Sequence, residues 1–228
     1  KLVEEVPSEK KVDRMNFEHQ IEFRNVTHKY EDLDKLSLDS VYITIPKNNS
    51  VALVGSSGAG KTTAIDLILG LLKPVSGEVL VDGKDMHQSL LSWQKQIGYV
   101  PQSIYLIDDS IRNNVAFGVK QELINDEKVW NALRLAQLES FVGELSEKLD
   151  TMVGENGVRF SGGQRQRIGI ARALYHDPQV LIMDEATAAL DNETERSFMD
   201  SIELLSGELT VILIAHRIST VKNCDNIF

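Results

Sequence analysis

Residues Gly55 to Thr62 read Gly-Ser-Ser-Gly-Ala-Gly-Lys-Thr, and glycines at this spacing before a lysine and a threonine are typical of a phosphate-binding loop. Small residues let the backbone N–H groups turn inward around phosphate oxygens, and the N-terminus of the following helix adds a partial positive charge. In such loops the lysine reaches the β- and γ-phosphates, and the next hydroxyl can ligate Mg²⁺. The loop therefore predicts a site for a nucleoside triphosphate, with Lys61 and Thr62 at the phosphates and the metal.

An acidic pair, Asp184 and Glu185, follows the apolar run Val180–Met183. Because ligands of a doubly wound sheet bind at the carboxyl ends of its strands, we expect Asp184 to join the Mg²⁺ shell. Glu185 is one residue further along and would face the γ-phosphate, where a carboxylate can polarise an attacking water. The alternative is that the two residues only cap the helix that follows them.

A second glycine motif, Phe160-Ser161-Gly162-Gly163-Gln164, precedes a basic run with strong helical character. A serine and two glycines at a helix N-terminus leave an anion-binding end with no obstructing side chain. Taken alone, the motif would be an ordinary N-cap. Because the chain already has one phosphate loop, a second phosphate-binding end calls for a second γ-phosphate. The two motifs together predict a dimer with ATP held between two copies.

The elements that position these residues alternate between strand and helix. Strands are expected at residues 21–26, 40–45, 51–54, 77–82, 97–100, 180–183 and 209–214, and helices at 64–72, 126–138 and 192–205. From about residue 103 to about residue 176 the pattern is mainly helical, which predicts a helical subdomain inserted in the α/β core. Residues 1–18 are charged, contain Pro7 and predict a linker, which leaves residues 19–228 as the folded domain.

Composition narrows the range of partners. The net charge of −10 excludes a broad electrostatic attraction to nucleic acid or to anionic lipid. The single cysteine, Cys224, excludes an internal disulfide framework and fits a reducing compartment. The sequence contains no apolar run of the length that crosses a membrane, so we do not expect the chain itself to span one.

These motifs, in this order, resemble the nucleotide-binding domain of ATP-binding cassette (ABC) transporters over nearly all of residues 21–228. Gly55–Thr62 is similar to the Walker A motif, Val180–Asp184 to the Walker B motif, and Phe160–Gln164 to the signature motif, which usually begins with leucine. The resemblance implies an α/β fold: a P-loop NTPase core, with a RecA-like sheet plus an antiparallel β subdomain, and an inserted α-helical subdomain. Family members usually continue beyond the position of Phe228, so we expect a chain truncated at its C-terminus.

The resemblance also implies roles for individual residues. Glu185 would be the catalytic carboxylate, Gln102 the Q-loop glutamine that contacts Mg²⁺ and water, and His216 the switch histidine at the γ-phosphate. Each has a plainer alternative: Gln102 could be a solvated loop residue, His216 a satisfied histidine, and Tyr30, which matches the adenine-stacking aromatic, a core residue. The implied metal ligands are Thr62, Gln102 and Asp184. The implied nucleotide-binding set is Tyr30, Gly55, Ser56, Ser57, Gly58, Ala59, Gly60, Lys61, Thr62, Thr63, Phe160, Ser161, Gly162, Gly163, Gln164 and Asp191, the last closing a D-loop at Ala188–Asp191.

The segment Val153–Gly157 resembles the x-loop of exporter-type members, in which Glu155 would touch the coupling helices of the membrane domain; the alternative is a glycine-flanked surface turn. The implied function is the ATP-hydrolysing engine of an exporter or flippase, with ATP and Mg²⁺ as cofactors. It would work as a head-to-tail homodimer at the cytoplasmic face of the cell's inner membrane, joined to a transmembrane domain that precedes Lys1. The stretches Tyr99–Asp108, Asp191–Glu195 and Ala215–Asp225 look like those of flippases of lipid-linked oligosaccharides, although such an engine does not touch its cargo.

Three rival classes share the signature. Chromosome-maintenance ATPases insert a long coiled coil between the phosphate loop and the signature, whereas only residues 63–159 lie between them here. A translation-associated protein would carry two cassettes and no x-loop. A regulatory nucleotide sensor would be expected to lack Glu185.

Overall fold

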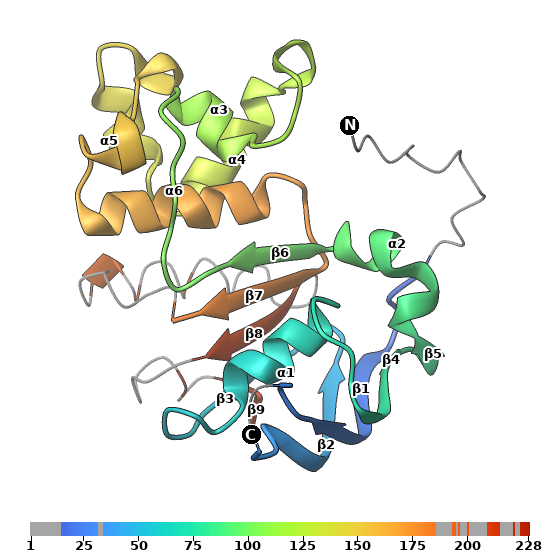
Figure 1. The fold of residues 1–228 in the computed structure, drawn as a ribbon. Coiled ribbons are helices and arrows are strands. Elements are labelled where there is room, and N and C mark those ends of the chain that lie inside the picture. The colour runs from blue at the N-terminus through green and yellow to red at the C-terminus, as the bar shows by residue number, and fades with distance from the viewer. Residues whose placement is uncertain are drawn as a thin grey trace, which may run out of the picture.

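The computed structural model describes residues 15–31, 34–185, 193–194, 196, 200, 209–214, 221 and 224–228. The described strands form two sheets (Figure 1). The antiparallel sheet has the strand order β2-β1-β4-β5 and consists of β1 (Gln20–His28), β2 (Leu38–Pro46), β4 (Ser76–Val81) and β5 (Lys84–Asp85). The parallel sheet has the order β6-β7-β8-β3-β9 and consists of β3 (Ser50–Leu53), β6 (Ile97–Val100), β7 (Val180–Asp184), β8 (Thr210–Ile214) and β9 (Asn226–Ile227).

Two of the described α-helices belong to the part of the chain before β6: α1 (Lys61–Ile68) follows β3, and α2 (Leu90–Gln94) leads into β6. Four more lie between β6 and β7 in the sequence: α3 (Ile111–Val115), α4 (Asp126–Leu135), α5 (Glu139–Glu144) and α6 (Gly162–Leu174). These four gather beside one edge of the parallel sheet, with α6 running alongside β6 (Figure 1). The described part also contains short 3₁₀ helices. One, η1 (Met86–Ser89), lies between β5 and α2, and the others lie among the four helices: η2 (Gln121–Leu123), η3 (Lys148–Asp150) and η4 (Glu155–Gly157).

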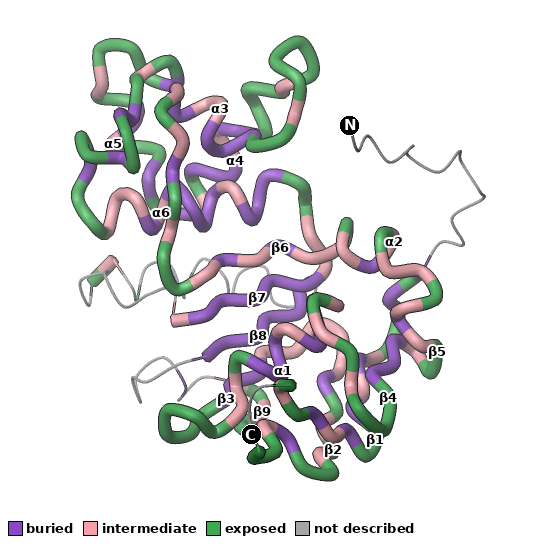
Figure 2. Tube along the Cα trace, in the orientation of Figure 1, coloured by how far each residue is buried: buried purple, intermediate pink, exposed green. Residues whose placement is uncertain are grey.

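The parallel sheet separates two apolar clusters, one around α6 and one around α1 and the antiparallel sheet. Figure 2 shows β7 and β8 as buried runs, and every residue of both strands is buried. Side chains alternate across a strand, so Leu181 and Met183 point into the α6 cluster while Val180 and Ile182 point into the other. Burial on both faces explains why these strands are continuous apolar runs rather than alternating ones.

The helix after the phosphate loop ends earlier than the apolar pattern predicts. We expected it to reach residue 72, but α1 ends at Ile68, and Leu71 is 65% exposed. Gly70 adopts φ +70°, which stops the helix. The N–H of Leu71 bonds to the carbonyl of Asp66 (2.9 Å) and that of Gly70 to Leu67 (3.1 Å), the two bonds of a Schellman motif.

Packed structure begins inside the stretch that we assigned to the linker. Met15 and Phe17 are buried, and the Phe17 ring meets Trp93 edge-on at a centroid distance of 5.8 Å. The Met15 N–H donates to Ser92 Oγ (3.0 Å), and the Gln96 side-chain amide donates to the Met15 carbonyl (2.6 Å). Met15 and Phe17 therefore belong to the core, and residues 1–14 lie outside the described part.

The predicted strand at residues 209–214 is present as β8, which pairs with β3. A further strand that we did not predict, β9, also pairs in parallel with β3. The predicted helix at residues 192–205 lies mostly outside the described residues. Among the helices that are described, none has the length and apolar character needed to span a membrane.

Candidate nucleotide-binding and hydrolysis site

A cleft of about 420 Å³ opens where the strands of the parallel sheet end at their carboxyl termini. The loops after β3, β6 and β7 all reach it, and β8 contributes its last residue. Its lining comprises Tyr30, Lys35, Leu36, Ser37, Ser57, Gly58, Ala59, Gly60, Lys61, Thr62, Thr63, Gln102, Glu185 and Ile214. The phosphate loop, the predicted Q-loop glutamine and the predicted catalytic carboxylate are thus brought together in one place.

The phosphate loop has the backbone that its glycines predict. Gly58 and Gly60 adopt φ +79° and +94°, the left-handed region that favours glycine. A Cβ on Gly60 would lie 2.5 Å from the carbonyl oxygen of Ser37, so that position has no room for a side chain. Gly60 is also the N-cap of α1 and offers no side-chain acceptor, and the first helical turn has no acidic residue. The helix N-terminus therefore keeps N–H donors and positive potential for an anion.

Lys61 folds its ammonium group back over this loop. Its Nζ donates to the carbonyl oxygens of Gly55 (2.8 Å) and Ser56 (3.0 Å). The charge thus sits at the centre of the loop, where phosphate oxygens would be its alternative partners. Thr62, the next residue, also lines the cleft.

Tyr30 forms the far wall of the cleft in a fixed orientation. Its hydroxyl lies 3.1 Å from Thr63 Oγ1, and its ring meets the His28 ring edge-on at 4.9 Å. A ring fixed in this way at the cleft could stack on a planar base. Thr63, which we placed in the nucleotide-binding set, lines the cleft but is buried and holds Tyr30.

The acidic pair lies at the carboxyl end of β7, one strand away from Gln102. The Gln102 side-chain Nε2 donates to Glu185 Oε2 at 2.8 Å. Glu185 adopts φ +51°, an unfavourable conformation for a residue with a side chain, and its N–H is held by the Ile214 carbonyl of β8 (3.1 Å). The backbone and Gln102 together orient the carboxylate, which is the arrangement that a general base needs.

Asp184 carries its charge into a largely buried environment, with 8% of the residue exposed. Burial, followed by the negative charges of Asp184 and Asp66, raises the pKa of the Tyr99 phenol on the neighbouring strand β6. The carboxylate of Asp184, the hydroxyl of Thr62 and the amide oxygen of Gln102 are hard oxygen donors of the kind Mg²⁺ prefers. No cluster of three or more His, Cys, Asp or Glu able to hold a metal occurs among the described residues.

The signature residues form a well-capped helix start that does not line this cleft. Ser161 Oγ accepts from the Gln164 N–H (3.2 Å), and Gln164 Oε1 accepts from the Ser161 N–H (2.8 Å), a complete capping box. Phe160, which stands where leucine is usual, is buried and meets the Phe141 ring edge-on at 5.9 Å. The other two predicted site residues, Asp191 and His216, lie outside the described part of the chain.

Lys35, Leu36 and Ser37 line the cleft but were absent from our sequence prediction. Ser37 Oγ donates to the His28 carbonyl (3.0 Å), which folds this segment against the end of β1, two residues before Tyr30. They match no chemical motif, and their place five to seven residues after Tyr30 was the only available signal.

Residues 38–188 match the family model described as ABC transporter. The chain belongs to the ABC transporter family. It is 43% identical over 208 residues to the ATP-dependent lipid A-core flippase of Escherichia coli (strain K12), an alignment that covers 91% of this chain and 36% of the flippase; the Shigella flexneri flippase gives the same values. Among solved structures, a bacterial Atm1-family ABC exporter with ATP bound superposes with a TM-score of 0.88 and 34% identity, over 99% of this chain and 39% of the exporter.

These likenesses confirm the predicted family, the P-loop NTPase fold with its two sheets and helices, and ATP hydrolysis as the activity of this ABC domain. They favour exporters over the rival cassette ATPases. The chain spans 36% of the length of the flippases that it matches, so the remainder of such a protein lies outside it. The roles of the individual site residues stay predictions, supported by the cleft that gathers them.

Proposed function

We propose that this chain is the ATP-hydrolysing engine of a membrane exporter or flippase, working as a head-to-tail dimer with two ATP molecules at the interface. The observation that carries the proposal is the meeting of the phosphate loop, Gln102 and Glu185 in one cleft. A phosphate-binding loop alone could serve a nucleotide sensor. A carboxylate oriented in the same cleft adds the group that hydrolysis requires.

In the proposed reaction, Tyr30 stacks on the adenine, and the loop amides with Lys61 hold the phosphates. Thr62, Gln102 and Asp184 would hold Mg²⁺, which supplies positive charge against the phosphate oxygens. Glu185 takes a proton from a water molecule as the water oxygen attacks the γ-phosphorus. The bond from that phosphorus to the ADP oxygen breaks, and ADP and phosphate leave. His216 is proposed to contact the γ-phosphate.

The decisive test of hydrolysis is Glu185→Gln, which keeps size and shape and removes the base. An amide oxygen at the same place can still accept the Gln102 hydrogen bond, so the local geometry should survive. We expect ATP binding within error of the wild type and a turnover lower by about 10²–10⁴-fold. Glu122→Gln, an exposed substitution on η2 outside the cleft, is the matched control. Turnover near that of the wild type in Glu185→Gln would remove Glu185 from the role of base.

In the proposed dimer the N-termini of α1 and α6 bind the phosphates of two different ATP molecules. The phosphate loop lines the described cleft and the signature serine does not, so Ser161 would serve the nucleotide of a second copy. Mixing a Lys61→Ala chain with a Ser161→Arg chain leaves one intact composite site per heterodimer. ATP binding at that site, absent from either variant alone, is the expected result. Specific ATPase activity that is independent of protein concentration down to the nanomolar range would contradict a reversible dimer.

The partner that would convert hydrolysis into transport is a transmembrane domain, proposed to precede Lys1 and to hold the engine at the cytoplasmic face of the membrane. The helical subdomain exposes side chains that such a partner could cover: Tyr105 is 66% and Val158 76% exposed, and Glu155 stands on η4 beside Val158. Exposed apolar side chains of this size can be covered by a partner protein.

For the cargo we propose a lipid-linked oligosaccharide, on the sequence likeness of the stretches Tyr99–Asp108, Asp191–Glu195 and Ala215–Asp225. The relatives named lipid A-core flippases support a lipid cargo as a class. ATP-dependent movement of a fluorescent lipid-linked oligosaccharide across vesicles containing the full-length protein tests this. Movement of an unrelated lipid alone would reassign the cargo and leave the engine unchanged.

A further inference from the structure

Arg172, near the end of α6, binds three oxygens of two segments that precede it by more than fifty residues. Its Nη1 donates to the Tyr105 carbonyl (2.9 Å), its Nε to the Asn114 carbonyl (2.8 Å), and its Nη2 to Asn114 Oδ1 (3.0 Å). The guanidinium also lies over the Phe117 ring, 5.0 Å from its centroid. Among the described residues no carboxylate pairs with it, so its charge is met by neutral oxygens and an aromatic face. Such an arrangement fixes the relative positions of the three segments that carry these groups, and it does not neutralise a negative charge.

Asn114 completes the connection from inside the protein. It is fully buried, and its side-chain Nδ2 donates to the carbonyls of Ile107 and Ser110, both at 3.0 Å. Its Oδ1 accepts from the Ile107 N–H (3.0 Å) as well as from Arg172. One side chain therefore fixes the segment that follows Gln102, the start of α3, and the end of α6.

The same segment also packs against the middle of α6. A Cβ on Gly169 would lie 2.6 Å from Ile104 Cδ1, so glycine is what lets Ile104 lie on the helix. Near the signature, Gly157 lies between Arg165 of α6 and Leu106 of the segment: a Cβ there would lie 2.8 Å from Arg165 Cδ and 3.0 Å from Leu106 Cδ1. The segment is thus attached to α6 by apolar contact at Gly169 and by the hydrogen bond from Arg172 to Tyr105.

We propose that Arg172 is a positioning residue that locks residues 104–109 to α6, so that Gln102 and the signature serine Ser161 move as one rigid unit. Ile104 is two positions along the chain from Gln102, a span of at most about 7 Å. A shift of the locked segment is therefore passed on to Gln102, and through its hydrogen bond to Glu185. The inference rests on the proposed catalytic roles of Gln102 and Glu185 and adds what sets their position.

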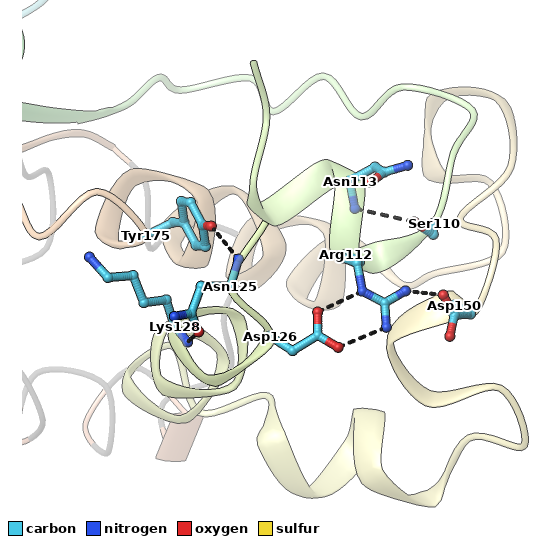
Figure 3. A network of polar contacts seen from close by, with 8 residues as sticks. All are labelled: Ser110, Arg112, Asn113, Asn125, Asp126, Lys128, Asp150 and Tyr175. Carbon is cyan, nitrogen blue, oxygen red and sulfur yellow. Dashed lines mark hydrogen bonds and ion pairs between the residues drawn. The ribbon is translucent and has the colours of Figure 1, made fainter. Parts of the chain in front are cut away.

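A second arginine in the same subdomain provides the matched control. Arg112 on α3 forms a bidentate pair with Asp126 of α4, with Nε–Oδ1 at 2.8 Å and Nη2–Oδ2 at 3.0 Å, and it also pairs with Asp150 of η3 (Figure 3). In Figure 3 the pairs of Arg112 join α3 to α4 and to η3, and neither pair involves a residue of the segment 104–109. Arg112 thus holds the subdomain together, whereas Arg172 holds the subdomain to the segment after Gln102.

The experiment compares Arg172→Lys with Arg112→Lys in the full-length protein. A lysine ammonium keeps the charge but cannot meet three oxygens with the planar fork of arginine. For Arg172→Lys we expect kcat for ATP hydrolysis to fall about tenfold or more, because misplacement of a catalytic group by an ångström can cost up to about 10²-fold. KM for ATP should stay within about twofold, because Arg172, Tyr105 and Asn114 do not line the cleft. Arg112→Lys should lower Tm, but it should not lower kcat while leaving KM unchanged.

Hydrogen exchange gives a readout that needs no catalysis. In the wild type the amide of Ile107 donates to Asn114 Oδ1. In Arg172→Lys this amide should exchange faster, while the amides in the middle of α6 keep their protection. Faster exchange over the whole subdomain, or the same kinetic loss in Arg112→Lys, would overturn the proposal. A wild-type protein that hydrolyses no ATP would refute the proposed function, yet the exchange experiment would still decide whether Arg172 fixes the segment.

Gly169→Ala tests the same lock without removing a hydrogen bond. Alanine is the better helix former in a helix interior, and this gain opposes the cost of displacing Ile104, so Tm should change little. The added methyl must displace Ile104, so kcat should fall by about threefold or more, and Ile104→Val, which removes Cδ1, should recover part of the rate. Full activity in Gly169→Ala together with an unchanged rate in Arg172→Lys would show that the attachment of this segment does not position Gln102.

Discussion

Asp82 holds the beginning of the folded chain against the turn between β4 and β5, and Asp82→Asn measures what that contact contributes. Its carboxylate accepts hydrogen bonds from the backbone N–H groups of Glu18 (2.5 Å), His19 (2.8 Å) and Gln20 (2.8 Å). Asp82 adopts φ +50° and precedes Gly83 at φ +75°, a turn that Asn-Gly forms as readily as Asp-Gly. The substitution therefore removes the charge and leaves the turn in place.

The size of the effect follows from the three donors. A hydrogen bond to a charged group contributes about 1.5–3 kcal/mol when buried. These three share one carboxylate near the surface, where solvent screens the charge, so we expect a loss of about 1–2 kcal/mol in total. In a domain of this size about 1 kcal/mol corresponds to about 2–4 °C, and Tm should therefore fall by about 2–8 °C.

The difference should depend on pH in a defined direction. Burial alone would raise the pKa of Asp82, but the hydrogen bonds from Gln20, Glu18 and His19 outweigh it and hold the pKa below its usual range. A carboxylate whose pKa is lower in the folded chain stabilises the fold above its unfolded value, about 3.9, and this contribution is lost as the pH falls through the folded value. The wild type and Asp82→Asn should differ fully at about pH 7, begin to converge near about pH 4, and converge once the pH is below the folded pKa of Asp82.

Thermal unfolding followed by tryptophan fluorescence is a suitable assay, because Trp93 packs on Phe17 in the segment that Asp82 anchors. Asp39→Asn is the control: it removes the same charge from the same sheet, at a residue that contacts only its neighbour's hydroxyl, Ser40 Oγ (3.0 Å). An equal loss of Tm in the control would assign the effect to net charge. A difference between the wild type and Asp82→Asn that persists unchanged to about pH 3 would exclude the carboxylate as its cause.

Three further predictions concern the site and its coupling. Tyr30→Ala should weaken ATP binding about tenfold by loss of base stacking, whereas Tyr30→Phe keeps the ring and should bind within about twofold, as calorimetry can show; equal binding by all three would place the base elsewhere. Gly60→Ala should lower Tm more than Gly83→Ala, because both have positive φ but only Gly60 faces a backbone oxygen within 2.5 Å, and the reverse order would contradict the packing of the loop. In vesicles containing the full-length protein, Glu155→Ala should lower transport more than ATPase rate; equal losses would assign Glu155 to the fold or the ATP site.

The phosphate loop and the acidic pair were predictable because their chemistry is local. Backbone N–H groups converge only if small residues occupy adjacent positions, and all of these residues lie within Gly55–Thr62. The acidic pair needs only an apolar strand immediately before it, and β7 supplies that strand. In both places the feature and its cause lie within a few residues of one another.

Features that depend on distant partners were not predictable in this way. The packing of residues 15–18 was not predictable because charge and proline content do not reveal that Phe17 meets Trp93 or that Asp82 binds three backbone amides. The length of α1 was overestimated because the apolar pattern continues to residue 72, while Gly70 ends the helix by its backbone conformation. The contact between Gln102 and Glu185 joins residues 83 positions apart and requires β6 and β7 to be neighbours, which periodicity does not specify.

The adjacency of β6 and β7 explains how one site can recruit residues from so many places. Parallel neighbours require a crossover that returns the chain to the starting edge of the sheet, and α6 provides the return. Its 13 residues extend about 20 Å, enough to run the length of a strand. The N-terminus of α6 must then lie at the edge where β6 and β7 end, the side on which Figure 1 also shows the phosphate loop before α1. Topology therefore brings both glycine motifs to one edge of the molecule, and only the first of them lines the described cleft, which leaves the second directed to the surface that a second copy would cover.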